Sequence, residues 1–550
     1  MSPQTTDVLV VGSGFGGAIP AYHLAAAGAR VTVLERGPRL ATEEFSHDLN
    51  LGAYPRIVDV IKGDGISVVA GNCVGGGSVV YFAASLRAPS FVFGRRHPAG
   101  RRLWPSTITR ATLDPWYDQV EQALPVTRLD WTDVSYAGGV LAAACDRAGH
   151  TCNPVPVAVD RARCTDCNWM LSGCRFGAKR SMLLNYLPAA EAHGAEIRPL
   201  HEVQLVRPST EPGYRYAVDW TTLDGGDYTC PTGVGTIHTR TLVLAAGAVG
   251  TPVLLQRSAP LLGGVPAAVG GWFSGNGDRV SVAELDEGKV RSLLGLSRSD
   301  TVAYQALPIG MPITSASYDR LDAAAPEFSR FTLQQIYFPT VTNTLARTAA
   351  GLWSGADKKR MRARWRSWLT VLAMTEDEAE GRFGAPPLTG SFTRLANGIG
   401  LGTMRFTPGA GTRRGWDAAD AHTRSILEKD GLATVRPWDE HVTGTVTAHP
   451  LASCRTGDSA ALSALDDLHE LRSHPGIFVT DGSAVPTSLT VNPSLTIAAL
   501  AERACPAIAA RCAQSGVALR YAPSDPLTGR AQGGAVAYAA RELAARAALG

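Results

Sequence analysis

The chain has 550 residues, 45% of them hydrophobic, and its 52 basic and 49 acidic side chains give a formal net charge of +3. Such a balance offers no electrostatic case for nucleic acid. The first residues lack a signal-peptide pattern, and no stretch approaches the roughly 18 to 20 continuous apolar residues of a membrane span. We therefore expect a cytoplasmic protein without a transmembrane segment, and the length predicts two domains that interleave in sequence.

The N-terminal segment predicts a dinucleotide-binding unit. An apolar run, Val8 to Val11, leads into Gly12, Gly14 and Gly17 in G-x-G-x-x-G spacing, and a helical stretch and a second apolar run then end at Glu35. The first glycine permits a tight turn, the second lets the backbone approach a pyrophosphate, and the third allows the helix to pack on the strand. Glu35 is placed for a ribose hydroxyl pair and would repel a 2′-phosphate, so FAD or NAD is favoured over NADP.

Two later segments also combine glycines with apolar runs. The segment from Gly71 to Phe82 reads GNCVGGGSVVYF, and its four glycines suit a backbone that lies against a planar or phosphate ligand. A tight turn without a ligand has the same composition. The segment from Leu242 to Ser258 predicts a strand that runs into Gly247 and a helix that begins at Thr251 and Pro252.

The C-terminal third contains another strand and helix. The segment from Ile477 to Ala504 is an apolar strand that ends at Asp481 and Gly482, and a helix follows Asn492. An acid at the carboxyl end of a parallel strand lies where such sheets bind ligands. His449 precedes this segment in the sequence TAHPLASC.

Together these segments resemble the glucose-methanol-choline (GMC) oxidoreductases, and within them the cholesterol oxidase-like bacterial branch. The resemblance rests on the first fingerprint, the Gly71 loop, the sequence from Trp104 to Leu124, GAVGTPVLLQRS, and HPLASC, in which Ala452 and Ser453 replace the family's glycines. It implies an α/β fold in which a Rossmann-like FAD-binding domain interleaves with an antiparallel-sheet substrate domain. It also implies FAD, and oxidation of an alcohol by hydride transfer to flavin N5.

The expected organisation follows from this resemblance. Residues 1–100, 166–275 and 441–515 are the three parts of the FAD-binding domain, 101–165 link them on the substrate side, 276–440 form the substrate domain, and 516–550 are a C-terminal tail. Four aromatic residues of the substrate segment suit either an apolar pocket or the core: Tyr304, Phe331, Tyr337 and Phe338. The basic run from Lys358 to Arg366 predicts a solvated helix face, and the alanine-rich end of the chain predicts a helix.

By position, His449 matches the family's active-site histidine and Asn492 matches its partner. Histidine suits removal of a hydroxyl proton because its ordinary pKa lies near neutrality. The predicted cofactor-binding residues are Gly12, Gly14, Phe15, Gly17, Glu35, Gly71, Gly76, Gly77, Ser78, Val203, Ala246, Gly247, Asp481, Gly482 and Asn492. For Val203 a place in the ordinary core is an equal alternative.

The Gly71 loop bears on how the flavin is held. It contains no histidine, so the histidyl-flavin bond of some relatives has no donor there, and we predict non-covalent FAD. Cys73 offers a thioether as the alternative. Tyr81 stands where the family commonly has asparagine, which is a departure at the predicted flavin contact.

The aromatic and aliphatic residues of the substrate segment favour a bulky, mostly hydrophobic alcohol over a sugar as the substrate, sterol-like or of polyketide type, with O2 or another electron acceptor. Two alternatives stay open. One is a flavin-binding tailoring enzyme or lyase of the same fold that desaturates, cyclises or eliminates. The other is an FAD electron-transfer protein with a metal cluster in the run from Cys164 to Cys174.

That run, CTDCNWMLSGC, has the spacing of a ferredoxin cluster motif, but Met170 stands at one ligand position. A [4Fe–4S] cluster normally takes four thiolates, and Cys164, Cys167 and Cys174 supply three. No histidine lies within the run to complete a zinc site. We therefore predict no metal here and interpret the run as a structural element of the family near the flavin domain.

Overall fold

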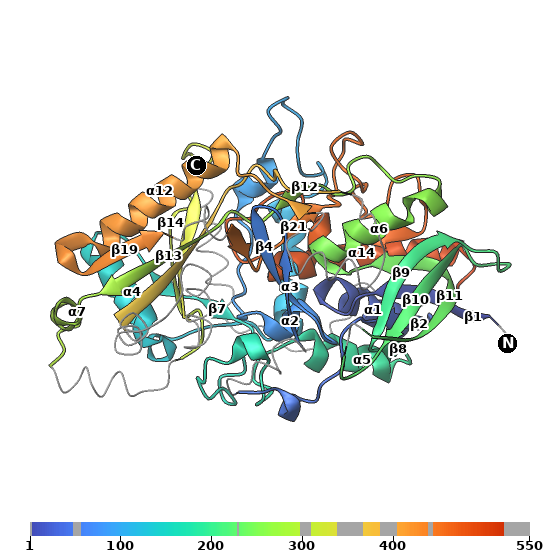
Figure 1. Cartoon of the computed structure of the whole chain (residues 1–550), viewed down its shortest axis with the longest axis horizontal. Coiled ribbons are helices and arrows are strands. Elements are labelled where there is room, and N and C mark those ends of the chain that lie inside the picture. The colour runs from blue at the N-terminus through green and yellow to red at the C-terminus, as the bar shows by residue number, and fades with distance from the viewer. Residues whose placement is uncertain are drawn as a thin grey trace.

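The computed structural model describes residues 3–47, 57–227, 230–297, 310–337, 367–384, 404–437 and 444–521 (Figure 1). A mixed seven-stranded sheet lies toward one end of the long axis, and an antiparallel six-stranded sheet lies toward the other. The predicted fold class, a Rossmann-like domain joined to an antiparallel substrate sheet, is confirmed. The residue boundaries proposed for the domains stay a prediction.

The seven-stranded sheet has the order β8-β2-β1-β11-β10-β9, and β22 also pairs with β11. The pairings among β8, β2, β1, β11 and β22 are parallel, whereas β10 pairs antiparallel with both β11 and β9. The strands are β1 (Gln4–Val11), β2 (Val31–Leu34), β8 (Glu196–Arg198), β9 (His201–Pro208), β10 (Tyr216–Leu223), β11 (Pro231–Leu244) and β22 (Ile477–Val479). Because the five parallel strands run side by side, the loops after them meet at one edge.

Both faces of this sheet are covered, as a parallel sheet requires. Alternate residues of β1 point to opposite faces: Val8 and Val10 join one apolar cluster, while Leu9 and Val11 join another. Among the described residues, the second cluster includes side chains of α6 (Gly247–Leu262). The first includes side chains of the short helix α2 (Gly77–Val80) and of four longer helices, α1 (Phe15–Ala26), α3 (Arg110–Ala123), α5 (Tyr186–Ala192) and α14 (Ser494–Gln514).

One buried carboxylate joins the four longer helices of the first cluster. Glu502 of α14 is 1% exposed and accepts hydrogen bonds from Tyr186 Oη of α5 at 2.6 Å and from Gln119 Nε2 of α3 at 2.9 Å. His23 Nε2 of α1 lies 2.6 Å from the same carboxylate. A buried charge is tolerated when its oxygens are paired in this way, so Glu502 fixes the helices relative to one another.

The six-stranded sheet is antiparallel throughout, in the order β19-β13-β16-β15-β14-β6. Its strands are β6 (Asn153–Pro154), β13 (Asp278–Leu285), β14 (Ser315–Arg320), β15 (Phe331–Ile336), β16 (Trp368–Thr375) and β19 (Ala433–Pro437). One face packs on α4 (Tyr136–Arg147), α7 (Glu287–Leu294) and α12 (Ala410–Leu427). The other face turns toward the seven-stranded sheet, and the candidate site lies between them.

Shorter elements connect the two sheets. A three-stranded sheet consists of β3 (Val58–Lys62), β4 (Ile66–Gly71) and β20 (Thr445–Thr447). The helix α2 (Gly77–Val80) follows the second glycine loop. Three two-stranded pairs complete the strands: β5 (Thr127–Arg128) with β7 (Pro156–Val157), β12 (Gly271–Ser274) with β21 (Leu451–Ser453), and β17 (Arg382–Phe383) with β18 (Met404–Arg405).

Several sequence predictions concern the substrate segment and the tail. Phe331 and Tyr337 lie in the core between the six-stranded sheet and its helices, not in the cavity between the sheets. Tyr304, Phe338, the basic run from Lys358 to Arg366 and the alanine-rich end lie outside the described residues. Within the described ranges, no helix combines the length and the apolar character needed to cross a membrane.

Candidate active site

A cavity of about 760 Å³ lies between the two sheets, within the range of about 300 to 1,000 Å³ that is usual for ligand pockets. The carboxyl edge of the seven-stranded sheet forms one side of it. The other side is largely apolar and comes from the six-stranded sheet and its neighbours, with Val280, Ile313, Ile336, Leu372, Phe383 and Trp416. All predicted site residues line the cavity except Gly17 and Ser78.

The first glycine loop is closely packed at its ends and open in its middle. A Cβ on Gly12, whose φ is +96°, would lie 2.3 Å from Ala245 O, and one on Gly17 would lie 2.0 Å from Gly12 O. These two glycines are therefore required by the protein's own packing. A Cβ on Gly14 would meet nothing closer than Gly76 Cα at 3.9 Å, so the space beside it is free for a ligand.

Glu35 follows β2 at the edge of the cavity. Its carboxylate accepts hydrogen bonds from Ser13 N at 3.0 Å, from Ser13 Oγ at 2.6 Å and from Gly37 N at 2.9 Å. Burial raises the pKa of Glu35, while these three donors act in the opposite sense. The carboxylate is thus fixed beside the glycine loop, where the sequence predicts a ribose.

The second glycine loop lies against the first. A Cβ on Gly76 would stand 2.9 Å from Gly14 Cα, whereas one on Gly77 would have nothing within 4 Å. Ser78 is fully buried behind this loop, where its hydroxyl donates to Gly75 O at 2.6 Å and accepts from Met182 N at 2.9 Å. The structure therefore gives Ser78 a role in shaping the loop and no contact with the cavity.

The residues beside this loop bear on how a flavin is held. Tyr81 lines the cavity, packs edge-on against Phe15 at 5.4 Å between ring centroids, and donates its hydroxyl to Arg180 O at 2.6 Å. Cys73 is 1% exposed and belongs to the apolar core behind the loop rather than to the cavity lining. A thioether from Cys73 to a ligand in the cavity has no geometric support.

Asp481 joins β22 to the start of α6. Its carboxylate accepts from Gly247 N at 2.8 Å, from Thr251 Oγ1 at 2.6 Å and from Ser483 N at 2.8 Å. Burial raises the pKa of Asp481 despite these bonds. The oxygens of Asp481 are therefore engaged within the protein, and the residue holds the backbone around Gly482 at the cavity edge.

The cysteine run lies directly behind the second glycine loop. The buried ammonium of Lys179 links them, because it donates to Met170 O at 2.6 Å and to Tyr81 O at 2.9 Å. Burial lowers the pKa of Lys179 to about 7. In the part of the chain that the structure describes, the sulfur atoms of Cys164, Cys167 and Cys174 are not gathered within 4.8 Å of one another. Lys179 thus ties the cysteine run to the second glycine loop.

His449 follows β20 and points into the cavity from the other side. Its Nδ1 lies 2.9 Å and 3.0 Å from the two carboxylate oxygens of Asp278, at the start of β13. Thr447 Oγ1 donates to the same carboxylate at 2.9 Å and accepts from His449 N at 2.9 Å. A carboxylate only accepts, so a ring proton sits on Nδ1, and in the neutral form of the ring Nε2 carries the lone pair.

Asn492 completes the polar end of the cavity. Its Nδ2 lies 3.3 Å from His449 Nε2, and its Oδ1 accepts from Gln334 Nε2 of β15 at 2.8 Å. The structure thus brings the two predicted catalytic residues together, although they stand 43 positions apart in the sequence. Sequence reasoning missed both Asp278 and Gln334, since an acid or an amide at one position of a strand carries no motif.

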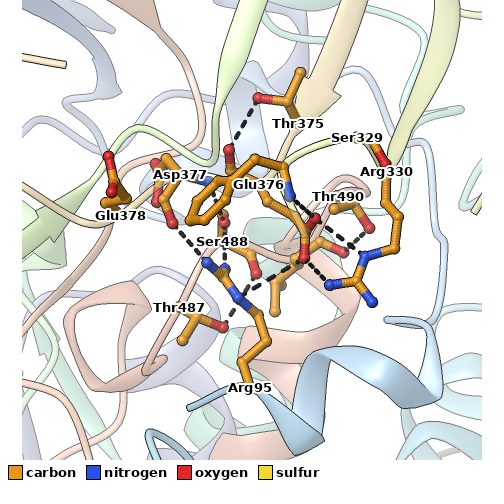
Figure 2. A network of polar contacts seen from close by, with 12 residues as sticks. Arg95, Ser329, Arg330, Thr375, Glu376, Asp377, Glu378, Thr487, Ser488 and Thr490 are labelled. Atoms are coloured by element: carbon orange, nitrogen blue, oxygen red, sulfur yellow. Dashed lines mark hydrogen bonds and ion pairs between the residues drawn. The ribbon is translucent and has the colours of Figure 1, made fainter. Parts of the chain in front are cut away.

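A buried charged network fixes the loop that carries Asn492 (Figure 2). Arg95 donates to Ser488 Oγ at 2.8 Å and to Asp377 O at 2.7 Å, and Asp377 N donates to Ser488 Oγ at 2.9 Å. Arg330 pairs with Glu376 at 2.6 Å beside them. Buried polar groups that are fully paired rigidify their surroundings, so this loop is held before any ligand binds.

Comparison with known proteins then identifies the family. Models described as GMC oxidoreductase match residues 6–269 and 348–501. The chain belongs to the GMC oxidoreductase family. This class acts on CH–OH groups, and FAD is the cofactor typical of it.

Individual relatives of this GMC oxidoreductase share about a quarter of its residues. It is 28% identical to a cholesterol oxidase of Mycobacterium tuberculosis, over 90% of each chain. It is 25% identical to the long-chain-alcohol oxidase FAO4B of Arabidopsis thaliana, over 89% of this chain and 65% of the relative.

Two solved structures share the fold. The pyridoxine 4-oxidase from Mesorbium loti has a TM-score of 0.62 at 16% identity, with 92% of this chain and 99% of that chain covered. An FAD-dependent oxidoreductase from Chaetomium thermophilum has a TM-score of 0.60 at 15% identity, with the same coverage.

The residues present fit FAD. The open space beside Gly14 and Gly77 lies in front of the N-terminus of α1, where backbone N–H groups favour a pyrophosphate. Glu35 lies beside this space, and Val203 is also on the cavity wall. The cavity continues from there to His449 and Asn492, as an extended dinucleotide requires.

Replacement of Gly14 by alanine tests this cradle. The added Cβ meets no close atom in the protein, so the fold is expected to persist. The affinity for FAD should fall at least about tenfold, which corresponds to about 1.4 kcal/mol of binding free energy. Fluorescence titration of the apoprotein with FAD measures the affinity. Gly17→Ala is the contrasting variant and should reduce the melting temperature instead, because its Cβ meets Gly12 O. Unchanged FAD affinity in Gly14→Ala would contradict the assigned cradle.

Replacement of Asp278 by asparagine tests the contact that orients His449. The amide offers no negative charge to the Nδ1 proton, so kcat should fall about a hundredfold while FAD stays bound. Steady-state kinetics with an alcohol that reduces the flavin measures the loss. Asp219→Asn removes a carboxylate that is paired with Arg207 away from the cavity, and it should keep full activity. Equal kcat in the two variants would show that Asp278 has no part in orienting His449.

Proposed function

We propose that this GMC oxidoreductase binds FAD non-covalently and oxidises a bulky, mostly hydrophobic alcohol to a carbonyl compound. The observation that carries the proposal is the polar end of an otherwise largely apolar cavity, where His449 Nε2 and Asn492 Nδ2 lie 3.3 Å apart. Non-covalent binding is supported by the burial of Cys73 and by the absence of histidine from the Gly71 loop.

When bound, FAD supplies the hydride acceptor for the carbinol carbon. His449 acts as the base, since Asp278 holds the proton on Nδ1 and leaves the lone pair of Nε2 to receive the hydroxyl proton. The resulting imidazolium is stabilised by the Asp278 carboxylate, which is 5% exposed and therefore little screened. Asn492 presents its amide N–H groups beside Nε2, where one of them holds the alcohol oxygen in place.

The walls of the cavity support a lipophilic substrate. Val280 and Leu372 from the six-stranded sheet, with Ile313, Phe383 and Trp416 from neighbouring segments, offer apolar surface and few polar partners for a sugar. The named activities of the cholesterol oxidase and the long-chain-alcohol oxidase agree with this class of substrate. O2 or another acceptor would serve as the final electron acceptor.

Anaerobic bleaching of the visible flavin absorbance tests the proposal. Cholesterol, 1-dodecanol, pyridoxine and glucose form the panel, and a lipophilic alcohol should bleach the flavin while glucose does not. His449→Gln should retain FAD and slow bleaching about 10² to 10⁴-fold, because the base is lost. His474→Gln, outside the cavity, is the matched control. Bleaching at the wild-type rate in His449→Gln would contradict the assignment of the base.

A further inference from the structure

One strand of the six-stranded sheet contacts the loop that carries Asn492. On β15, Thr332, Gln334 and Ile336 share a face, because alternate strand residues do. Thr332 Oγ1 donates to Thr490 O at 2.6 Å, Gln334 Nε2 donates to Asn492 Oδ1 at 2.8 Å, and Ile336 lines the cavity. Two residues of the strand, spaced two apart, therefore bond to two residues of the loop with the same spacing.

The same face of the sheet also supplies Asp278. In the strand register Asp278 lies opposite Met374 of β16, and Met374 lies opposite Thr332 of β15. In the next row Val280 lies opposite Leu372, and Leu372 lies opposite Gln334. Directly opposite residues face the same side, so Asp278 and Gln334 project toward the cavity from strands on either side of β16. One holds His449 and the other holds Asn492.

Gln334 occupies a position that an apolar residue would fill at lower cost. It is fully buried in a row with Val280 and Leu372, and its Oε1 has no hydrogen-bond partner among the described residues. An unpaired buried acceptor lowers the free energy of unfolding, so an amide at this position suggests a functional role. The Gln334 side chain uses its Nε2 to donate a hydrogen bond to Asn492 Oδ1.

That bond determines which end of the Asn492 amide faces His449. With Oδ1 bound to the Gln334 amide N–H, Nδ2 must point to His449 Nε2, so Asn492 donates toward the ring. If the amide were reversed, Oδ1 would face Nε2 and favour a proton there, which would remove the lone pair that the base requires. The orientation of the Asn492 amide thus affects whether His449 Nε2 can accept a proton.

We propose that Gln334 is a positioning residue that sets the amide orientation of Asn492 and, through it, keeps His449 Nε2 ready to accept a proton. The inference rests on the proposed function for its kinetic consequence but not for its structural one. It assigns to β15 the same kind of role toward Asn492 that Asp278 on β13 has toward His449.

The test is a double-mutant cycle in the FAD-loaded enzyme. Gln334→Met removes the donor with little change of volume, Asn492→Leu removes its target, and the double variant combines them. The readout that needs no substrate is the 15N signal of His449 Nε2 in histidine-labelled protein, assigned with His449→Gln. Gln334→Met should move this signal in the direction that Asn492→Leu does, and the double variant should show no further change.

Gln335→Met is the matched control. Gln335 is equally buried on the same strand, but it faces the other way and bonds to Pro312 O and Thr314. It should leave the His449 signal in place. If Gln334→Met does not fold, Gln334→Leu also lacks the donor and carries the test. A His449 signal at the wild-type position in Gln334→Met, or additive changes in the double variant, would overturn the inference.

Kinetics give the second readout. With an alcohol that bleaches the flavin, Gln334→Met should lower the limiting rate of flavin reduction about tenfold while KM changes little. When Asn492 is already replaced by leucine, adding Gln334→Met should not lower this rate further. If the His449 signal moves as expected but no alcohol reduces the flavin, Gln334 is still a positioning residue and the proposed function is wrong. If an alcohol is oxidised but the signal does not move, the proposed function stands and the role of Gln334 does not.

Discussion

The contact between Asp278 and His449 is the interaction on which the site depends. Asp278 begins a strand of the antiparallel sheet, whereas His449 lies on the segment that leads back into the parallel sheet. Without the carboxylate, neither the ring orientation nor the proton on Nδ1 is fixed. The candidate active site therefore lies at the junction between the two sheets, since the carboxylate of Asp278 and the imidazole that it orients come from different parts of the fold.

Buried polar side chains at this junction hold the loop that carries Asn492. Asn492 follows a loop that Arg95 and Asp377 fix through Ser488, and Asn276 also bonds to the backbone of Leu489 and Val491 in this loop. Buried polar groups are costly when they are left unpaired, so such a network specifies one arrangement. A preorganised amide and imidazole need little rearrangement when an alcohol enters, which is how positioning lowers an activation barrier.

The sequence predicted the parallel sheet and its loops well because each rests on local pattern. Gly12, Gly14 and Gly17 followed an apolar strand and preceded a helix, and these features are readable over some 30 residues. His449 and Asn492 were found through resemblance to a family. Asp278 and Gln334 could not be found, because their meaning depends on which strands pair and in what register. Ser78 shows the converse: it belongs to a ligand-like loop, but its hydroxyl is used to hold the loop itself.

The central claim is that an alcohol bound between the sheets is oxidised, with bound FAD supplying the hydride acceptor and His449 taking the hydroxyl proton. Anaerobic stopped-flow reduction of the bound flavin, with an accepted alcohol and the same alcohol deuterated at the carbinol carbon, tests it most directly. The account predicts that the visible flavin absorbance is lost more slowly with the deuterated alcohol. Equal rates with the two alcohols, at concentrations that saturate the enzyme, would contradict it.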